Sequence, residues 1–209
     1  MARASQRNVF LNCPFDENYI ELLRPLLFTV VRLGFNPTIA NERSDSGELR
    51  LDKILKLIRG ARFSIHDLSR IQAKKSGEFY RLNMPFELGL EFGCRRFGGR
   101  KHQSKKTLVL GSKEYAYMKA ISDIAGIDIQ YHRDNPIELV LSVRNWFSGT
   151  VGVKSAPSGS VIWSQFMDFM VYFNDEHKRK GFKRADFKTM SMAEYLRFMK
   201  RWVKRQETG

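Results

Sequence analysis

Two carboxylates, Asp67 and Glu87, stand where an α/β protein would keep its chemistry. Asp67 ends the apolar, strand-like segment 61–67, and Glu87 follows Pro85 where the next helix is expected to begin. Ligands of open α/β sheets bind outside the carboxyl ends of the strands. In the first turn of a helix, Glu87 would be held in its charged form by unpaired backbone N–H groups and by the helix dipole. The sequence therefore predicts that both acids contribute to one pocket.

A carboxylate such as Glu87 has two uses in the cleavage of glycosidic bonds. It can attack the anomeric carbon as a nucleophile, or it can stabilise an oxocarbenium-like cation. O-glycosidases usually also need a carboxylic acid that protonates the leaving oxygen. Nicotinamide, in contrast, leaves ribose as a neutral molecule, so a single Glu would suffice. In the alternative interpretation Glu87 only stabilises its helix, Asp67 makes an Asx turn or a helix cap, and Glu91 is a solvated or salt-bridged neighbour.

Apolar segments alternate with helical patterns along residues 1–148. The alternation predicts an α/β fold in which five parallel strands are each followed by a helix. Right-handed crossovers favour a flavodoxin-like sheet of order 2-1-3-4-5, so that the loop 12–16, Asp67 and the Glu87 helix face one cleft. The strands are expected at 9–11, 35–40, 61–67, 106–110 and 127–131, and the helices at 19–33, about 51–60, from Pro85 onward, 115–124 and 136–147.

The remainder of the chain has a different character. Gly and Pro residues in 149–160 indicate a linker between the α/β domain, 1–148, and a basic helical extension, 161–209. The extension is expected to form two amphipathic helices rich in aromatic residues and methionine, at 161–173 and 191–203.

The formal charge of +14 and the pI near 10.0 are the strongest compositional signal. Such a surplus attracts polyanions at long range whatever the fold. Residues 151–209 carry twelve Lys/Arg and six Asp/Glu, so this basic region is a candidate contact for nucleic acid. The alternative is a solvated, solubilising surface, because no RRM, helix-turn-helix or KH motif accompanies the charge.

The residues give little support to metal or membrane functions. Cys13 and Cys94 are too few for a disulfide framework or a zinc cluster, and the four histidines have no metal-ligand spacing, so no metal is expected. No P-loop or dinucleotide fingerprint occurs. No apolar stretch approaches the length of a membrane span, and the chain is expected to be cytoplasmic, with no membrane partner.

The segment 81–89, Arg-x-Asn-x-x-Phe-Glu-Leu-Gly, resembles the catalytic segment of bacterial TIR-like NAD-hydrolysing domains. Its Phe-Glu-Leu-Gly part is also similar to a segment of nucleoside 2-deoxyribosyltransferases. The opening 9–15, Val-Phe-Leu-Asn-Cys-Pro-Phe, resembles the loop after the first strand of the deoxyribosyltransferases, and Asp67 falls where that family has an acidic residue. The resemblance covers about residues 8–148.

The resemblance implies a flavodoxin-like domain that uses Glu87 as the catalytic carboxylate at a ribosyl C1′. The implied activity is cleavage of the nicotinamide–ribose bond of NAD+, with no cofactor, in a bacterial antiviral defence system activated by a partner protein or by oligomerisation. The alternatives are a hydrolase or transferase of nucleosides or nucleotides, and a non-catalytic module that binds nucleotides or nucleic acid. The resemblance and the loop positions together assign substrate contacts to Asn12, Pro14, Phe15, Ser46, Asp67 and Asn83.

Overall fold

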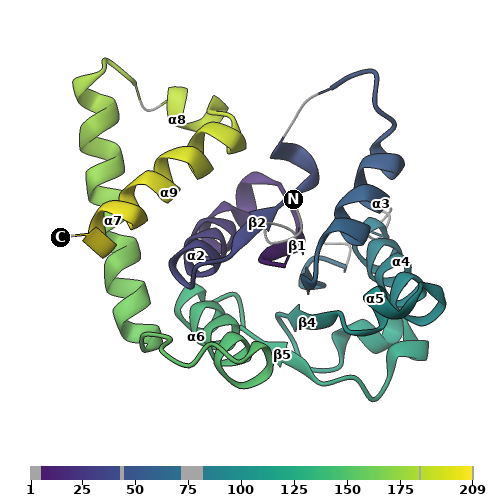
Figure 1. The fold of residues 1–209 in the computed structure, drawn as a ribbon. Coiled ribbons are helices and arrows are strands. Elements are labelled where there is room, and N and C mark those ends of the chain that lie inside the picture. The colour runs from purple at the N-terminus through teal and green to yellow at the C-terminus, as the bar shows by residue number, and fades with distance from the viewer. Residues whose placement is uncertain (1–5, 43–44, 72–81, 184, 209) are drawn as a thin grey trace.

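The computed structural model describes residues 6–42, 45–71, 82–183 and 185–208, which Figure 1 shows coloured along the chain. A five-stranded parallel sheet of order β2-β1-β3-β4-β5 lies at its centre, so the predicted flavodoxin-like α/β fold is confirmed. The strands are β1 (Asn8–Asn12), β2 (Asn36–Thr38), β3 (Phe63–Asp67), β4 (Lys106–Gly111) and β5 (Ile129–Tyr131).

The central strands β1 and β3 are almost wholly buried because helices cover both faces of the sheet. All five residues of β3 are buried, including Ser64, His66 and Asp67. Parallel pairing sets Asn12 beside His66 at the carboxyl ends of the two strands. Polar residues therefore meet at the point where the strand order reverses, which is where such sheets bind ligands.

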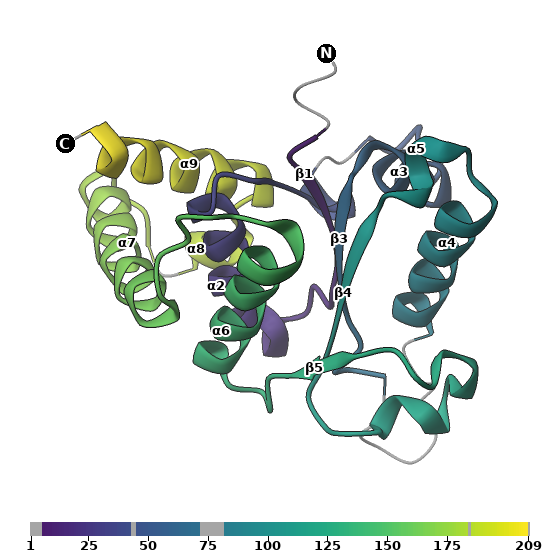
Figure 2. The same cartoon turned by 60° about the horizontal axis from the view of Figure 1, so that its bottom comes forward.

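Helices form a layer on each side of the sheet, as Figure 2 shows. One face is covered by α2 and α6, and the other by α3, α4 and α5. The chain moves from β1 to β2 in one direction along the sheet and then to β3, β4 and β5 in the other direction. Because each crossover is right-handed, the helices of the two directions must lie on opposite faces. The helices of the two layers are α2 (Ile20–Arg32), α6 (Pro136–Trp146), α3 (Arg50–Gly60), α4 (Asn83–Phe97) and α5 (Arg100–Gln103).

The C-terminal helices add a further layer outside α2 and α6 (Figure 2). They are α7 (Gly159–Arg179), α8 (Asp186–Thr189) and α9 (Met192–Thr208). The ring of Phe28 on α2 has its centroid 5.6 to 5.8 Å from those of Phe166, Phe169 and Trp202. These rings belong to one buried cluster with the sheet residues. The extension is therefore joined to the α/β domain through a common core.

The expected linker at 149–160 is shorter in the structure. Helix α6 continues into a π-helical turn, Phe147–Val151, and α7 begins at Gly159. The guanidinium of Arg144 donates hydrogen bonds to the carbonyl oxygens of Pro157 (2.7 Å) and Ala156 (2.9 Å). These bonds hold the connecting segment against α6.

The expected helix at 115–124 is wrong. Two short 3-10 helices, η3 (Ala116–Lys119) and η4 (Ser122–Ile124), replace it. Tyr115 has a left-handed φ of 55°, which a regular helix does not allow at its start. Two further 3-10 helices, η1 (Glu17–Tyr19) and η2 (Ala40–Glu42), follow β1 and β2.

None of the described helices combines the length and the apolar composition needed to cross a membrane.

Candidate functional site

Glu87 lies in the second turn of α4, not in the first as predicted. The helix begins at Asn83, and the N–H of Phe86 already donates to the carbonyl oxygen of Leu82 at 3.0 Å. Free N–H groups of the helix terminus therefore do not hold the carboxylate in its charged form. The expected source of its charge stabilisation is wrong because the helix starts earlier than the position of Pro85 suggested.

Burial controls the protonation of Glu87 instead. The residue is only 4% exposed, and it shares the inward face of α4 with Met84, Leu88 and Glu91 at helical spacing. Desolvation raises the pKa of Glu87 to about 7, and the positive charge of Arg50 partly opposes the shift. The Glu87 carboxyl is thus expected to titrate near neutral pH, well above the usual range of a glutamate.

Asn12 connects β1, β3 and α4 beside this carboxyl. Its Nδ2 donates to the carbonyl oxygen of Met84 at 2.9 Å and lies 2.9 Å from Nδ1 of His66. Burial, with the nearby charge of Lys105, lowers the pKa of His66 to about 3, so its ring is neutral. In the described part of the chain, Oδ1 of Asn12 and Nε2 of His66 are buried without a hydrogen-bond partner. Two unpaired polar atoms thus remain at the switch point.

Asp67 is fully buried and accepts hydrogen bonds from three residues. Its Oδ2 accepts hydrogen bonds from the Tyr19 hydroxyl and from Nε2 of His132 (3.1 Å), and its Oδ1 accepts one from the Ser69 N–H (2.8 Å). Burial raises the pKa of Asp67, but these hydrogen bonds outweigh burial and hold it below its usual value. The Asx turn, which was one of the alternative roles predicted for Asp67, is therefore present.

The carboxylate of Asp67 is 0% exposed, so it is not open to a ribose hydroxyl as the resemblance implied. The reason is that its oxygens already accept from three partners on separate segments of the chain. Its neighbour Cys13 is also buried, and its thiol pKa is raised by burial and by the negative charges of Asp67 and Glu87. Cys13 is therefore an inert, buried thiol.

The other predicted contacts are distributed over several surfaces. Phe15 lies on the α2 side of the sheet, where it lines a cavity of about 680 Å³ with Met190 and Tyr195. Ser46 is exposed in the loop before α3, Asn83 is exposed at the start of α4, and Pro14 is buried. Alternation along β1 explains the separation, because Leu11 and Cys13 belong to the α2-side core whereas Asn12 reaches α4.

Of the predicted contacts, Asn12 reaches α4 through Met84 and Asn83 lies at the start of α4, whereas Phe15 and Ser46 lie elsewhere. Arg81 of the resembling segment lies outside the described residues.

Glu91 forms a buried ion pair that the sequence only partly indicated. Nζ of Lys105 lies 3.3 Å from Oε1 of Glu91, and both side chains are buried. The same ammonium donates to the carbonyl oxygens of Ile58 (2.7 Å) and Ala61. Burial raises the pKa of Glu91, and Lys105 opposes that shift. The salt-bridged alternative for Glu91 is confirmed, but nothing in the sequence around Lys105 marks it as buried.

Among the described residues, no group of three His, Cys, Asp or Glu side chains could hold a metal ion. Comparison of the chain with protein-family models, with curated proteins and with solved structures found no match. The resemblance to TIR-like domains and deoxyribosyltransferases therefore stays a prediction.

Proposed function

We propose that the chain is an N-glycosidase that cleaves the nicotinamide–ribose bond of NAD+, with Glu87 acting at the ribosyl C1′. The observation that carries the proposal is a nearly buried carboxyl with a pKa of about 7, on the helix that follows β3 and beside the end of β1. Perturbed carboxyl groups at the switch point of an α/β sheet are candidates for catalysis.

The electrostatics of Glu87 suit a cationic substrate. Desolvation makes the isolated carboxylate unfavourable, and a positive charge beside it lowers its pKa again. The ribosyl-pyridinium group of NAD+ brings such a charge, and so does the oxocarbenium-like transition state. The ionised form of Glu87 would therefore be favoured at the moment when it is needed.

In this reaction the bond between C1′ and the pyridinium nitrogen breaks, and its electron pair stays on the nitrogen. Nicotinamide leaves as a neutral molecule and requires no general acid. Water then adds to C1′ and releases a proton, which Glu87 can accept. The products are nicotinamide and ADP-ribose, so the reaction consumes NAD+ and water alone.

The biological setting is part of the same proposal. The resemblance favours a cytoplasmic bacterial defence protein that depletes NAD+ once a partner or a second copy of the chain assembles with it. The competing enzymatic function is hydrolysis or base exchange of a nucleoside or nucleotide. It is favoured by the protonated form of Glu87, which could donate a proton to a departing base.

Incubation of the full chain with NAD+ and with a set of nucleosides tests the two functions. We expect nicotinamide release by the unaltered protein and at least a hundredfold slower release by Glu87→Gln. Glu207→Gln, which changes an exposed acid on α9, is the matched control and should be unaffected. Retained release in Glu87→Gln would remove the catalytic assignment, and turnover of nucleosides alone would establish the competing function.

A second function, contact with nucleic acid, is supported by one surface of α9. Arg197, Arg201, Lys204 and Arg205 are exposed at helical spacing along it. The Arg201 guanidinium lies 5.6 Å from the centre of the Phe198 ring, which directs it along the helix surface. A row of cations at this spacing suits a phosphate backbone, which is recognised by charge rather than by sequence.

A further inference from the structure

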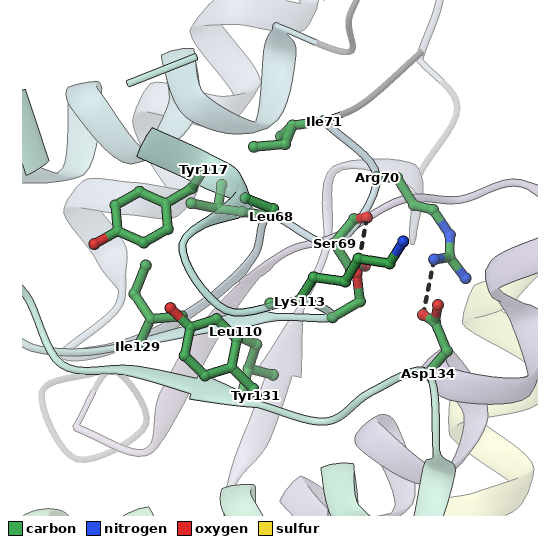
Figure 3. A pocket seen from close by; sticks show the side chains of 13 residues that line it. Leu68, Ser69, Arg70, Ile71, Leu110, Lys113, Tyr117, Ile129, Tyr131 and Asp134 are labelled. Atoms are coloured by element: carbon green, nitrogen blue, oxygen red, sulfur yellow. Dashed lines mark hydrogen bonds and ion pairs between the residues drawn. The ribbon is translucent and has the colours of Figure 1, made fainter. Parts of the chain in front are cut away.

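A second cavity opens at the carboxyl ends of β3, β4 and β5, and none of the residues predicted as a site is among those that line it. It has a volume of about 240 Å³, and Glu87 is not among the residues that line it. Figure 3 shows its two ends. Arg70, Lys113 and Asp134 lie at one end, and Tyr117 and Tyr131 lie at the other.

The charged end carries a surplus of positive charge. Nη1 of Arg70 donates to Oδ1 of Asp134 at 2.7 Å, which pairs one of the two cations. Lys113 forms no ion pair with any residue in the described ranges, and Figure 3 shows its ammonium directed toward Arg70. Nε of Arg70 and Oγ of Ser69 are buried without an acceptor among the described residues. Among the described residues, Lys113 is therefore the cation at this end that has no anionic partner, while Arg70 is paired with Asp134.

Arg70 is linked to a chain of hydrogen bonds that starts at the buried Asp67 and His132 and ends at the exposed Asp134. The N–H of Asp134 donates to Nδ1 of His132, whose Nε2 then donates to Asp67. Asp134 has a left-handed φ of 58°, and its carboxylate accepts the hydrogen bond from Arg70. The guanidinium is thus held in place before any ligand arrives, which lowers the entropy lost on binding.

The aromatic end is also held in place. The hydroxyl of Tyr131 accepts a hydrogen bond from the Tyr115 N–H at 3.3 Å. The Tyr131 ring lies against Gly111 at the end of β4, where a Cβ atom on the glycine would be 3.4 Å from the ring. Within the described residues, positive φ outside glycine occurs at Tyr115, Arg133 and Asp134, in the two loops that border the cavity. Non-glycine residues with a positive φ are strained, and such residues often cluster at ligand sites.

We propose that this cavity binds a nucleoside monophosphate, with the phosphate at Arg70 and Lys113 and the base against Tyr117 and Tyr131. Arg and Lys side chains attract phosphate by their charge and donate hydrogen bonds to its oxygens, and tyrosine rings stack on any base. Its volume of about 240 Å³ is below the range of about 300 to 1,000 Å³ that is usual for pockets of drug-sized ligands, so the cavity is too small for a dinucleotide. This site is independent of the proposed cleavage of NAD+.

Calorimetric titration of the full chain with AMP, GMP, CMP and UMP at physiological salt tests the proposal. At least one of them should bind at least tenfold more tightly than its own nucleoside and than inorganic phosphate. Failure of all four to bind at millimolar concentration would overturn the proposal. Equal affinity for the nucleotide and its nucleoside would also overturn it, because the phosphate would then make no contact.

Substitutions at the cavity distinguish specific nucleotide binding from nonspecific electrostatic attraction to a basic protein. Lys113→Gln should weaken binding of the nucleotide at least fivefold, and Arg70→Gln at least tenfold. Because Arg70→Gln also removes the ion pair with Asp134, the exposed Lys113 gives the cleaner measurement. Lys101→Gln, an exposed lysine on α5, is the matched control. If Lys101→Gln and Lys113→Gln weakened nucleotide binding equally, the proposed site would be contradicted. Unchanged binding by Glu87→Gln is expected, whatever its effect on NAD+ cleavage.

Discussion

Nδ2 of Asn12 lies 2.9 Å from Nδ1 of His66, and this contact joins the two strands at the switch point of the sheet. Because Nδ1 accepts, the proton of the neutral imidazole lies on Nε2. The same amide nitrogen of Asn12 also holds the first turn of α4 through Met84. A change at this amide therefore affects the strands and the Glu87 helix together.

Asn12→Ala should destabilise the protein by about 2 to 3 kcal/mol. The substitution removes both hydrogen bonds and leaves the Met84 carbonyl and His66 buried without their donor. Urea unfolding measures the loss. Asn83→Ala, at an exposed position on α4, should change the free energy of unfolding by less than about 0.5 kcal/mol. A loss of similar size in both variants would show that Asn12 is not an anchor.

The stability of the protein should fall as pH rises through the titration of Glu87. The pKa of this carboxyl increases from 4.5 to about 7 on folding, so the folded state binds the proton more tightly than the unfolded state. Between these values the unfolded chain ionises first, and by about pH 8 the cost to the folded state reaches about 3 kcal/mol. Glu87→Gln removes the titration.

Urea unfolding at pH 5 and pH 8 checks this expectation. Relative to the unaltered protein, Glu87→Gln should gain stability between pH 5 and pH 8, while Glu207→Gln should not. An equal difference between Glu87→Gln and the unaltered protein at both pH values would mean that the folded-state pKa is not raised.

Cleavage of NAD+ should depend on the ionised form of Glu87. With a pKa of about 7 in the free protein, kcat/KM should fall about tenfold for each pH unit below pH 7. Initial rates of nicotinamide release from pH 5 to pH 8 measure this dependence. A rate that stays constant from pH 7 to pH 5 would contradict a role for the carboxylate.

Binding of polynucleotide through α9 should be strongly salt dependent. The double variant Arg197→Gln/Arg201→Gln should bind single-stranded or duplex nucleic acid more weakly and should reduce the slope of log K against log salt by about 2. Fluorescence anisotropy across a salt series measures both quantities. The control Lys101→Gln/Lys119→Gln removes the same charge from exposed positions elsewhere. Equal effects of the two double variants would rule out a dedicated surface on α9.

The fold followed from local patterns that act over a few residues. Short apolar runs ended by polar loops located the strands, and the handedness of crossovers then determined their order. The region 115–124 was misassigned because its apolar spacing is helical while Tyr115 takes a left-handed φ. The resemblance indicated Glu87 through its neighbours in the sequence, but not its protonation.

The sequence by itself determined the sheet, its order and the helix that carries Glu87, because hydrophobic periodicity and chain handedness act locally. Only the tertiary structure decided how each acid is used. Asp67 is enclosed by Tyr19 and His132, which are 48 and 65 residues away, whereas burial against the sheet raises the pKa of Glu87. The cavity at Arg70 and Lys113 likewise forms from three strand ends. Such environments arise from contacts between residues distant along the chain, and no local pattern encodes them.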